Sequence, residues 1–409
     1  MSSPPITVIG AGFSGLVTAY HLITAGLHLR CPVKVIDVAT RPGGLIQTER
    51  TPNGLIERAA NGIVSSEGLL SMCERIGVRL ETTLPQARNR YIFRDGKPRR
   101  WPLGLTESMR LAATVVSSVA NLKPHAMETI QEWGDRVVGP KVTEYVLAPG
   151  LSGIYGGDPS RLSASLILGR RRGSHDRTKA NKSVRPRTVA PTGGMQELID
   201  GLVSFLEKSG VEILLGTQAS VELDSPTIIC TSAAEAAKLL AQIAPDASRQ
   251  LAKIELLPLV SITCFLERRT EQPQGFGCLF PRKEGFRSLG VLFNDCIFPE
   301  RSRMRSETWI LGGALDRAVI DVSDEELIAQ VTSEHQRLTS SRNVPVEVRV
   351  TRWRKALPHY TTDLELIINH RAILPGEILL VGNYLGKIGL TRIAEQAKEA
   401  ATKMIGILR

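Results

Sequence analysis

The sequence predicts an α/β fold, and three observations support this prediction. Short apolar runs typical of buried strands alternate with amphipathic stretches at helical spacing from residue 6 onward. A glycine-rich turn joins the first of these strands to the first helix. The chain has 409 residues, which is long enough for two or three lobes around more than one core.

The first strand is predicted at residues 6–9 and leads into the turn Gly10-Ala11-Gly12-Phe13-Ser14-Gly15. In this GxGxxG pattern the first glycine permits a tight turn, the second lets the backbone approach a pyrophosphate, and the third lets the helix pack against the strand. The helix that follows, as far as Gly26, offers unpaired N–H groups and a positive dipole end to phosphates. We therefore expect a dinucleotide site, with NAD and FAD both open.

A second strand at residues 33–36 ends at Asp37, whose carboxylate can accept hydrogen bonds from a ribose diol. Arg41-Pro42-Gly43-Gly44 follows within a few residues, and glycines placed there let the backbone come near a second part of the same cofactor. The alternative is a surface turn, since Pro-Gly-Gly forms turns in many contexts. The complete strand–turn–helix context favours the nucleotide site.

The formal charge of +10 favours anionic partners, namely polycarboxylate substrates, acidic lipid headgroups or nucleic acid. Nucleic acid is the weakest of these, because no known binding module accompanies the charge. The six cysteines are scattered without a metal-ligand spacing, so we expect reduced core thiols in a cytoplasmic protein. No export signal is visible, and the weakly polar stretch 111–120 is too short to span a bilayer, so any membrane contact would be peripheral.

The middle of the chain carries further strand and helix signals. Residues 55–62 indicate a strand running into a loop, residues 67–76 a helix, and residues 89–98 a hairpin with an Asp-Gly turn. Arg90 begins the first strand of that hairpin, and a lone arginine there is by default a solvent-facing charge. Residues 105–148 have helical periodicity, and their first apolar stripe predicts either core packing or contact with a membrane surface.

Two segments with unusual composition follow. Residues 150–163 indicate a glycine-rich tight loop between helices. Residues 170–187 are rich in lysine and arginine and almost lack apolar side chains. We interpret this stretch as a mobile loop, with an electrostatic guide for a carboxylated substrate or an acidic membrane as the alternative.

The α/β pattern resumes at Pro191, with a helix over residues 195–206 and strands at 211–215, 219–223 and 227–230. A second sheet is expected from strands at residues 257–265, 289–293, 308–312 and 346–353, with a helix at 325–338. Near the end, a buried strand at 378–381 enters the glycine loop Gly382–Leu390, and a helix covers 392–405. The dipole at the N-terminus of this helix could stabilise an anionic reduced flavin, or the segment is an ordinary strand–helix turn.

The paired glycine motifs resemble those of FAD-containing amine oxidases, desaturases and protoporphyrinogen oxidases, which makes FAD the expected cofactor. Within this group the chain resembles the protoporphyrinogen/coproporphyrinogen oxidase family, in segments that run from residue 6 to about 402. The telling segments are YGGDPSRLS (155–163) and ALPHYT (356–361), supported by PNGLIERAANG (52–62), NRYIFRDGK (89–97), PTGGMQELIDGL (191–202), GFGCLFPRKEG (275–285) and LVGNYLGKIGL (380–390).

The resemblance implies a Rossmann-like FAD-binding lobe, a substrate lobe on a sheet like that of p-hydroxybenzoate hydroxylase, and a helical lobe that touches the membrane. We assign residues 1–88, 188–247 and 368–409 to the FAD-binding domain. Residues 89–100, 169–187 and 248–367 are assigned to the substrate domain, and residues 101–168 to the helical domain. The implied location is the cytoplasm, with the cytoplasmic membrane as a peripheral contact.

The implied activity is the six-electron oxidation of a porphyrinogen to the porphyrin in haem biosynthesis, with dioxygen reoxidising the flavin and hydrogen peroxide as by-product. It requires no catalytic acid or base from the protein, and no metal ligand is predicted. Substrate contacts are expected from Arg90, which matches the family's propionate-binding arginine, and from Asn61 and Lys387. The residues implied in FAD binding are Gly10, Ala11, Gly12, Phe13, Ser14, Gly15, Asp37, Val38, Arg41, Gly43, Gly44, Leu45, Ala60, Asn61, Ala219, Val221, Trp353, Gly382, Asn383, Gly389 and Leu390.

Several alternatives stay open at this level. Lys387 replaces a smaller or acidic residue usual in the family, so it changes the flavin potential, binds a substrate carboxylate, or points away without effect. Residues 101–190 form a shorter region than is usual in the family, so the helical lobe and its membrane contact stay open. Competing functions are a related desaturase or amine oxidase, and a non-catalytic paralogue that binds porphyrin or flavin and delivers product to a ferrochelatase. Protoporphyrinogen and coproporphyrinogen are both possible substrates. The basic charge of the chain slightly favours coproporphyrinogen, which carries four carboxylates.

Overall fold

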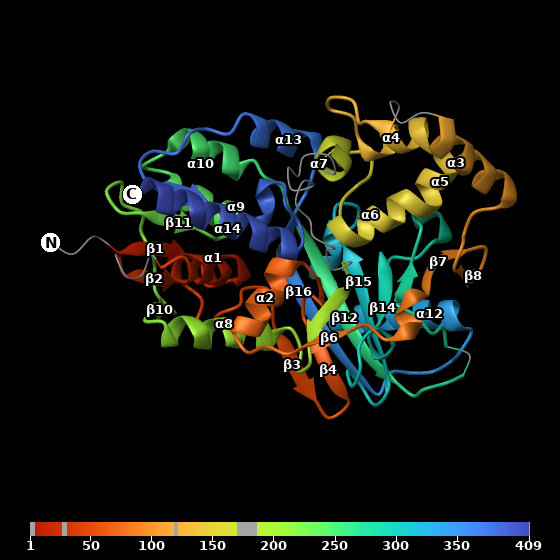
Figure 1. The fold of residues 1–409 in the computed structure, drawn as a ribbon. Helices are drawn as coiled ribbons and strands as arrows, with labels where there is room; N and C mark the ends of the chain where they lie inside the picture. The colour runs from red at the N-terminus through yellow and green to blue at the C-terminus, as the bar shows by residue number, and fades with distance from the viewer. Residues whose placement is uncertain (1–4, 27–30, 118–121, 170–185, 271, 409) are drawn as a thin grey trace.

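The strand β1 (Ile6–Ile9) lies at the centre of a five-stranded parallel sheet. The computed structural model describes residues 5–26, 31–117, 122–169, 186–270 and 272–408 (Figure 1). In spatial order the strands of this sheet are β10 (Glu212–Leu214), β2 (Val33–Ile36), β1, β11 (Thr227–Ile229) and β17 (Ile378–Leu380). All four pairings are parallel. The carboxyl ends of strands far apart in the sequence therefore meet at one edge.

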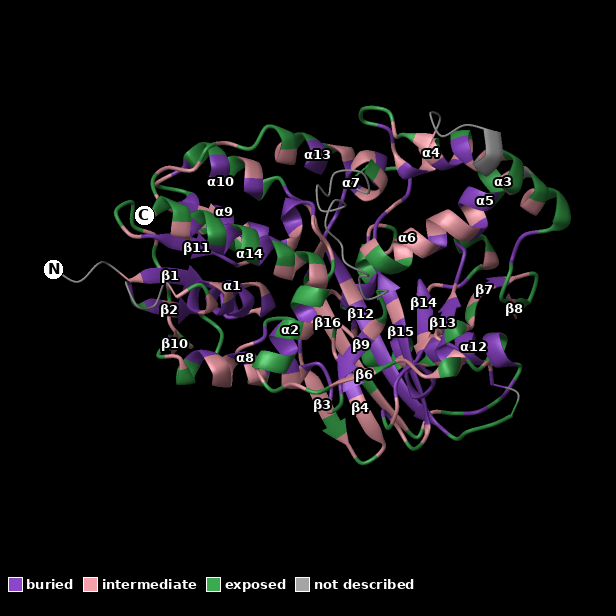
Figure 2. Cartoon of the chain, viewed as in Figure 1, coloured by how far each residue is buried: buried purple, intermediate pink, exposed green. Residues whose placement is uncertain are grey.

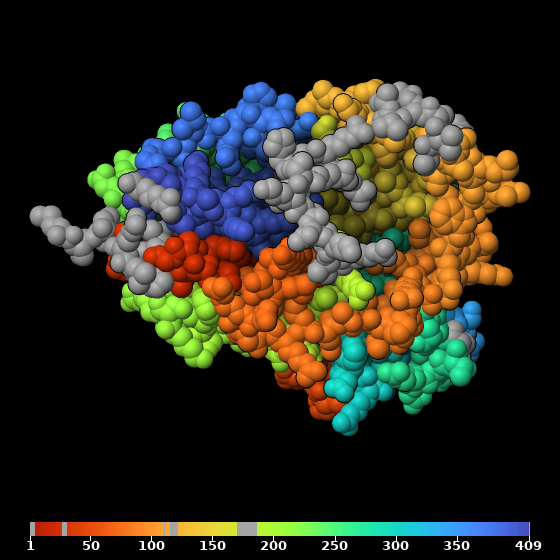
Figure 3. Space-filling model, in the orientation of Figure 1, coloured from red at the N-terminus to blue at the C-terminus, as the bar shows by residue number. Residues whose placement is uncertain are grey.

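Helices cover both faces of this sheet because its strands are apolar on both sides. On one face α1 (Phe13–Thr24), α8 (Gln196–Lys208) and α14 (Leu390–Ile407) pack on Val8 and Val35. On the other face α9 (Ala233–Leu240), α10 (Pro245–Ala252) and α13 (Thr362–Asn369) pack on Ile9 and Ile229. Figure 3 shows the red N-terminal and blue C-terminal segments side by side on the surface, where α1 and α14 pack against each other.

A second, seven-stranded sheet forms the other half of the molecule (Figure 1). Its strands in spatial order are β16 (Glu347–Pro358), β12 (Leu256–Leu266), β15 (Arg305–Gly312), β14 (Gly290–Phe293), β13 (Gly277–Leu279), β7 (Arg90–Arg94) and β8 (Lys97–Arg99). All pairs are antiparallel except β13 with β7. The helix α12 (Asp324–Thr339) packs its buried Leu327 and Val331 on this sheet. Figure 2 shows that the central strands of both sheets are largely buried.

Smaller elements join the two halves. The hairpin β3 (Thr48–Thr51) and β4 (Gly54–Glu57) is antiparallel, and β5 (Ile63–Val64), β9 (Thr188–Pro191) and β6 (Leu80–Thr82) form a three-stranded sheet beside α2 (Glu67–Arg75). Above the second sheet lie the helices α3 (Leu105–Ser117), α4 (Ile130–Val137), α5 (Pro140–Val142) and α6 (Ala148–Tyr155), and α7 (Ala164–Leu168) follows (Figure 1). A π-helix at Thr143–Leu147 connects α5 with α6.

Most predicted elements are present, and the corrections have local reasons. Residues 219–223 form no strand, because no neighbouring strand pairs with them. Residues 150–155, expected in a loop, belong to α6, which continues until Gly156 adopts a left-handed conformation (φ +62°). The glycines of α6 serve packing, since a Cβ at Gly153 would lie 2.9 Å from the Leu279 side chain. The strand β3 and the helices α9 and α10 were not predicted.

The predicted domain ranges stay a proposal. The strands assigned to the FAD lobe lie in the five-stranded sheet, the β3–β4 hairpin and the three-stranded sheet, and those assigned to the substrate lobe lie in the seven-stranded sheet. The six cysteines are free and buried, as expected. Within the described residues, no helix combines the length and apolar character needed to cross a membrane. The basic stretch is almost entirely outside the described residues, as it falls on positions 170–185.

The segments 155–163 and 356–361, nearly 200 residues apart in the chain, pack directly on each other. The backbone N–H of Asp158 donates to Nε2 of His359 (3.2 Å), and the N–H of Ser163 donates to the carbonyl of Tyr360 (2.8 Å). Nδ1 of His359 lies 2.8 Å from the carboxylate of Glu255, which also pairs with Arg161. Burial and the neighbouring Arg161 lower the pKa of His359 to about 4.

We predict that His359 makes the protein less stable as the pH falls from about 6.5 to 4. In this window the unfolded chain binds a proton at this residue while the folded chain does not, so each step down in pH favours unfolding. The full effect of a pKa of about 4, against 6.5 in the unfolded chain, is up to about 3 kcal/mol. Urea unfolding at several pH values measures it in the wild type and in His359→Gln, whose side-chain oxygen can still accept the Asp158 N–H.

The His359→Gln variant should lose less stability across this pH range than the wild type. His21, whose pKa burial also lowers to about 4, contributes equally to both proteins and cancels in the comparison. The exposed His370→Gln variant serves as the control and should follow the wild type. Parallel curves for the wild type and His359→Gln would contradict the assignment.

Candidate functional site

The glycine turn after β1 is shaped by two close backbone approaches. Gly10 has φ +111°, a conformation that side chains rarely permit. A Cβ at Gly15 would lie 1.8 Å from the carbonyl oxygen of Gly10, so only glycine lets α1 start this close to the strand. Ser14 Oγ donates to the carbonyl of Cys230 (3.1 Å), which ties the first turn of the helix to β11. The N-terminus of α1, at Gly12 and Phe13, thus opens directly at the edge of the sheet.

Asp37 is held at this edge by two backbone donors. The N–H of Ala11 donates to Oδ2 (2.6 Å) and the N–H of Ala39 donates to Oδ1 (2.8 Å). The carboxylate at the end of β2 is therefore fixed beside the glycine turn at the end of β1. Its remaining lone pairs can accept from a ribose diol, as the sequence predicts.

The second glycine motif meets the first. Gly12 and Gly43 form a parallel β-bridge, and the N–H of Gly43 donates to the carbonyl of Ala11 (2.8 Å). A Cβ at Gly44 would lie 3.3 Å from Cα of Gly12. The guanidinium of Arg41 donates to the carbonyls of Pro42, Gly44 and Ile46, so this arginine supports the loop from within. Leu45 follows with its side chain 37% exposed.

A pocket of about 440 Å³ adjoins Gly10 and Asp37. Its walls include Val38, Ala219 and Val221, which are among the residues expected to bind FAD. Val38 is 69% exposed, so an apolar surface faces the open side of this site. The sequence interpretation missed the wall formed by Glu235, Lys238 and Leu239 of α9 and by Gln242 in the turn after it.

The C-terminal glycine loop reaches the same edge of the sheet. β17 pairs with β11, and the N–H of Gly382 donates to Oε1 of Gln396 in α14 (2.9 Å). The hydroxyl of Tyr360 donates to the carbonyl of Asn383, which ties the loop to the ALPHYT segment. Gly389 has φ +87° and caps α14, whose helix starts at Leu390. Gly10, Asp37 and Gly382 therefore follow the carboxyl ends of three strands of one sheet.

The loop at residues 58–62 lies between the two sheets. Nε1 of Trp353, on β16, donates to the carbonyl of Arg58 (2.9 Å), and Ser261 Oγ on β12 donates to the same oxygen (3.2 Å). Two strands of the seven-stranded sheet thus hold the loop that carries Ala60 and Asn61. Asn61 lines a small buried cavity together with Arg301.

Arg90 lies at the start of β7, exposed, with its guanidinium carbon 4.5 Å from the centre of the Phe276 ring. It belongs to the seven-stranded sheet, pairing with Gly277 across the strands. Lys387 has its ammonium 2.6 Å from the carboxylate of Glu399 on α14. Its charge is engaged by this carboxylate, so a contact with a substrate carboxylate requires the pair to open.

Comparisons with known proteins agree with this geometry. The family model described as flavin containing amine oxidoreductase matches residues 13–387. A mitochondrial protoporphyrinogen oxidase of Nicotiana tabacum is 26% identical over 100% of this chain and 96% of its own length. Protoporphyrinogen oxidase 2 of Arabidopsis thaliana is 28% identical over 100% and 95%, and the Homo sapiens protoporphyrinogen oxidase is 24% identical over 98% of both chains.

Solved structures share the fold. A protein of Exiguobacterium sp. 255-15, whose assignment as a protoporphyrinogen oxidase is provisional, superposes with a TM-score of 0.80 at 18% identity over 100% of both chains. A reduced UDP-galactopyranose mutase superposes with a TM-score of 0.75 at 15% identity, covering 99% of this chain and 94% of its own. A putrescine oxidase variant gives 0.74 at 14% identity over 99% of both. The lobes predicted from the sequence thus match a known flavoenzyme fold.

The residues at the sheet edge fit FAD. Two helices, α1 and α14, begin at this edge and can direct N–H groups toward an anionic or polar part of the cofactor. Gly12 leaves space above the turn, because the nearest protein atom to a Cβ built there is 3.8 Å away. The pocket beside Asp37 has room for a nucleoside. Gly10–Gly15, Asp37, Gly43 and Gly44 would hold the cofactor together with the loop that starts at Gly382.

We predict that Gly12→Ala and Gly15→Ala weaken FAD binding by different routes. A methyl group at Gly12 meets no protein atom closer than 3.8 Å, so it occupies space that only the cofactor needs. A methyl group at Gly15 would collide with the Gly10 carbonyl and destabilise the fold itself by about 1–3 kcal/mol or more. Absorbance of bound flavin per protein and urea unfolding of flavin-free protein separate the two effects.

For Gly12→Ala we expect the flavin-free protein to unfold like the wild type. We expect FAD to bind at least roughly tenfold more weakly, which corresponds to a loss of about 1.4 kcal/mol in binding free energy. Gly68→Ala in α2 is the control, since a Cβ there meets nothing within 4 Å. Unchanged FAD affinity in Gly12→Ala would remove this glycine from the cofactor site.

Proposed function

Because the chain belongs to the flavin-containing amine oxidoreductase family and is an FAD-dependent oxidoreductase, we propose that it oxidises a porphyrinogen to the porphyrin in haem biosynthesis, with dioxygen as the final electron acceptor. The observation that carries the proposal is the similarity to protoporphyrinogen oxidases over 97–100% of the chain in plants and over 98% in Homo sapiens. The substrate is protoporphyrinogen IX or coproporphyrinogen III, which share a tetrapyrrole macrocycle with propionate groups.

The protein's own part in this reaction is to bind and orient. Bound FAD supplies the two-electron chemistry, in which a substrate C–H bond is oxidised. Arg90 presents a planar, permanently charged fork that suits a propionate, and the ring of Phe276 supports it from one side. The N-terminal end of α14 offers a positive dipole to the cofactor edge, and Trp353 holds the loop that carries Asn61 through the Arg58 carbonyl.

Two other functions remain as second candidates. A related desaturase or amine oxidase of the same fold would bind its substrate in an uncharged, aromatic site, whereas here Arg90 would place a positive charge at the front of the site. A non-catalytic paralogue would bind flavin or porphyrin and deliver product to a ferrochelatase. Purified protein that is colourless and does not take up FAD would favour the paralogue, and flavin reduction by an amine would favour the amine oxidase.

We predict that Arg90→Ala raises the Michaelis constant for porphyrinogen by roughly tenfold or more, because a charge-assisted hydrogen bond contributes about 1.5–3 kcal/mol. Fluorescence of the porphyrin formed in air measures the rate with each porphyrinogen. Arg90→Lys should recover part of the affinity, since the charge remains without the planar fork. Lys97→Ala, exposed on the same hairpin, is the control and should behave as the wild type.

An unaltered Michaelis constant in Arg90→Ala would place this arginine outside the substrate site. Absence of turnover with both porphyrinogens, in protein that holds FAD, would overturn the oxidase proposal itself.

We also propose a peripheral contact with the cytoplasmic membrane through the segment Trp101–Met109. Trp101, Leu105 and Met109 are 56%, 78% and 64% exposed, and Leu105 and Met109 lie one turn apart on α3. Nε1 of Trp101 donates to Ser108 Oγ (2.8 Å), which holds the indole against the helix. The exposed Arg99 and Arg100 flank this apolar patch. An aromatic and apolar stripe beside arginines is typical of helices that lie in the interface of an acidic bilayer.

We predict that replacing Trp101, Leu105 and Met109 together by serine lowers binding to vesicles containing phosphatidylglycerol by at least about tenfold. Each substitution removes the favourable free energy of moving an apolar side chain from water into the bilayer interface. Vesicle sedimentation measures the bound fraction. The control replaces the exposed Val344 and Val346, which precede β16, by serine. Equal binding by both variants, or no binding by the wild type, would contradict a membrane contact at α3.

A further inference from the structure

A small cavity lies where the β3–β4 hairpin meets the seven-stranded sheet. Its volume is about 10 Å³, close to the roughly 10–15 Å³ that one water molecule requires. Glu57 and Asn61 line it from the hairpin side, and Asn294 and Arg301 line it from the side of α11 (Asn294–Ile297) and the loop that follows. Four polar side chains therefore surround a space of the size of one water.

Asn294 leaves one acceptor unused at this cavity. Its Nδ2 group donates to Ser306 Oγ (3.1 Å) and to Thr308 Oγ1 (2.9 Å), which uses both amide hydrogens. Its Oδ1 atom is buried and has no partner in the described structure. The residue is only 7% exposed, so bulk water does not supply the missing donor.

Arg301 leaves one donor unused at the same cavity. Its guanidinium donates to Oε1 of Glu57 (3.0 Å) and to the carbonyl of Pro191 (3.0 Å). Nε makes no hydrogen bond; it forms an ion pair at 3.5 Å with Oε1 of Glu81, which also accepts no hydrogen bond. The side chain is 4% exposed. A buried donor or acceptor left unsatisfied costs about 1–3 kcal/mol, so two of them around one cavity call for a bridging molecule.

We propose that this cavity is a binding site for one ordered water molecule, which accepts from Arg301 Nε and donates to Asn294 Oδ1. Its second hydrogen can be accepted by the carboxylate of Glu57 or by the amide oxygen of Asn61. A site with one donor, one acceptor and two further polar neighbours gives the water the two to four partners that internal waters require. The water connects the buried Arg301–Glu57 pair with Asn61.

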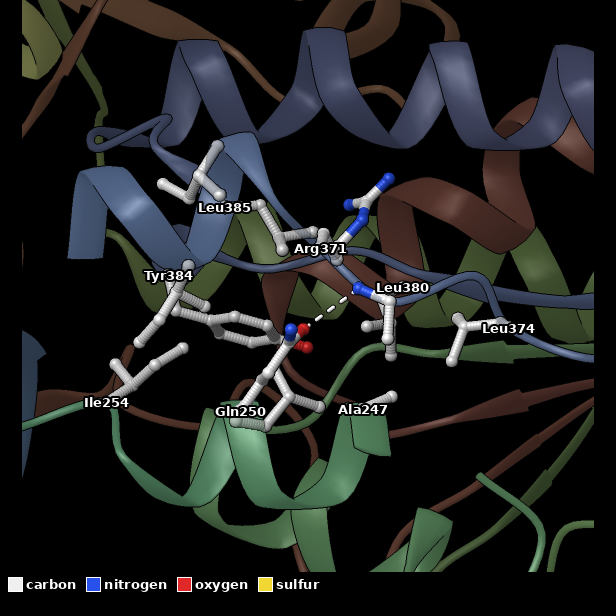
Figure 4. Close-up of a pocket in the computed structure, with 12 residues that line it drawn as sticks. Ala247, Gln250, Ile254, Arg371, Leu374, Leu380, Tyr384 and Leu385 are labelled. Carbon is white, nitrogen blue, oxygen red and sulfur yellow. Dashed lines mark hydrogen bonds between the residues drawn. The ribbon is translucent and has the colours of Figure 1, made fainter. Parts of the chain in front are cut away.

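A second cavity provides an internal comparison. It is also about 10 Å³ and lies between α10, α13 and the loop after β17 (Figure 4). Its walls are mainly apolar, and the amide of Gln250 is already used by the backbone of His370 and Ala372. The buried Tyr384 hydroxyl is the unpartnered polar atom there among the described residues. A single partner does not hold a water, so we expect this cavity to be dry.

The water has a consequence for the cofactor that rests on the proposed function. Asn61 belongs to the loop predicted to border the flavin, and Trp353 and Ser261 fix the start of this loop through the Arg58 carbonyl. The water would fix the other end by orienting the Asn61 amide. Asn294 and Arg301 would influence this loop through the water and Asn61.

A high-resolution crystal structure of the wild type tests the site directly. We expect one water within hydrogen-bond distance of Arg301 Nε and Asn294 Oδ1, in flavin-free and FAD-bound protein alike, and no water beside Tyr384. An empty cavity, or one filled by a rearranged side chain, would overturn the proposal. Because the flavin-free crystal suffices, failure of the porphyrinogen activity would leave this result unaffected.

A double-mutant cycle tests the coupling. Asn61→Ala and Asn294→Ala are combined, and the free energy of unfolding is measured by urea titration. We expect the effect of Asn61→Ala to fall to less than half in the Asn294→Ala background, since the bridge is already lost. Ser306→Ala, which removes a partner of Asn294 that does not line the cavity, is the matched control and should leave the Asn61→Ala effect largely intact. Additive effects in both pairs would contradict a shared water.

Discussion

The close approach of Gly15 to the carbonyl of Gly10 is the constraint on which the cofactor site depends. A side chain at Gly15 would force α1 away from β1, because its Cβ would lie 1.8 Å from that oxygen. With α1 in place, its N-terminus lies over the sheet edge, and Ala11 can donate to Asp37 while accepting from Gly43. One glycine contact therefore aligns three segments of the first 44 residues.

The same edge collects residues from the other end of the chain because the sheet is parallel. β11 pairs with both β1 and β17, so the loops that follow these strands emerge side by side. The second sheet is fixed in a different way, by buried charge. Burial would raise the pKa of Glu307, but Arg305 and His335 beside it lower that pKa to about 2. The ionised carboxylate joins β15 to α12 through His335 and pairs within β15 with Arg305, and both partners are less than 3% exposed.

The sequence predicts those parts of the molecule whose signal is local. The strand at residues 6–9, the turn at 10–15 and the hairpin at 89–98 depend on glycine placement and short periodicity, and the structure has them at the predicted residues. The helices α9 and α10 are short, so their periodic signal is weak, and the contribution of α9 to the nucleotide pocket was missed. The cavity shared by Asn61, Asn294 and Arg301 could not be predicted from the sequence. Asn294 and Arg301 lie more than 230 residues after Asn61, and no local pattern indicates that the two segments come into contact.

The titratable groups beside the loops after β11 and β17 indicate how the site can influence a flavin. Burial raises the pKa of the Cys230 thiol to about 12, and burial also raises the pKa of the Tyr384 phenol. Both side chains are therefore uncharged at neutral pH, and neither offers a nucleophile or a base. The fixed influences at this edge are backbone N–H groups, the N-terminal dipoles of α1 and α14, and the polar groups around Asn61. Oriented dipoles of this kind suit a reaction in which the protein positions the substrate and adjusts the electronic properties of the cofactor.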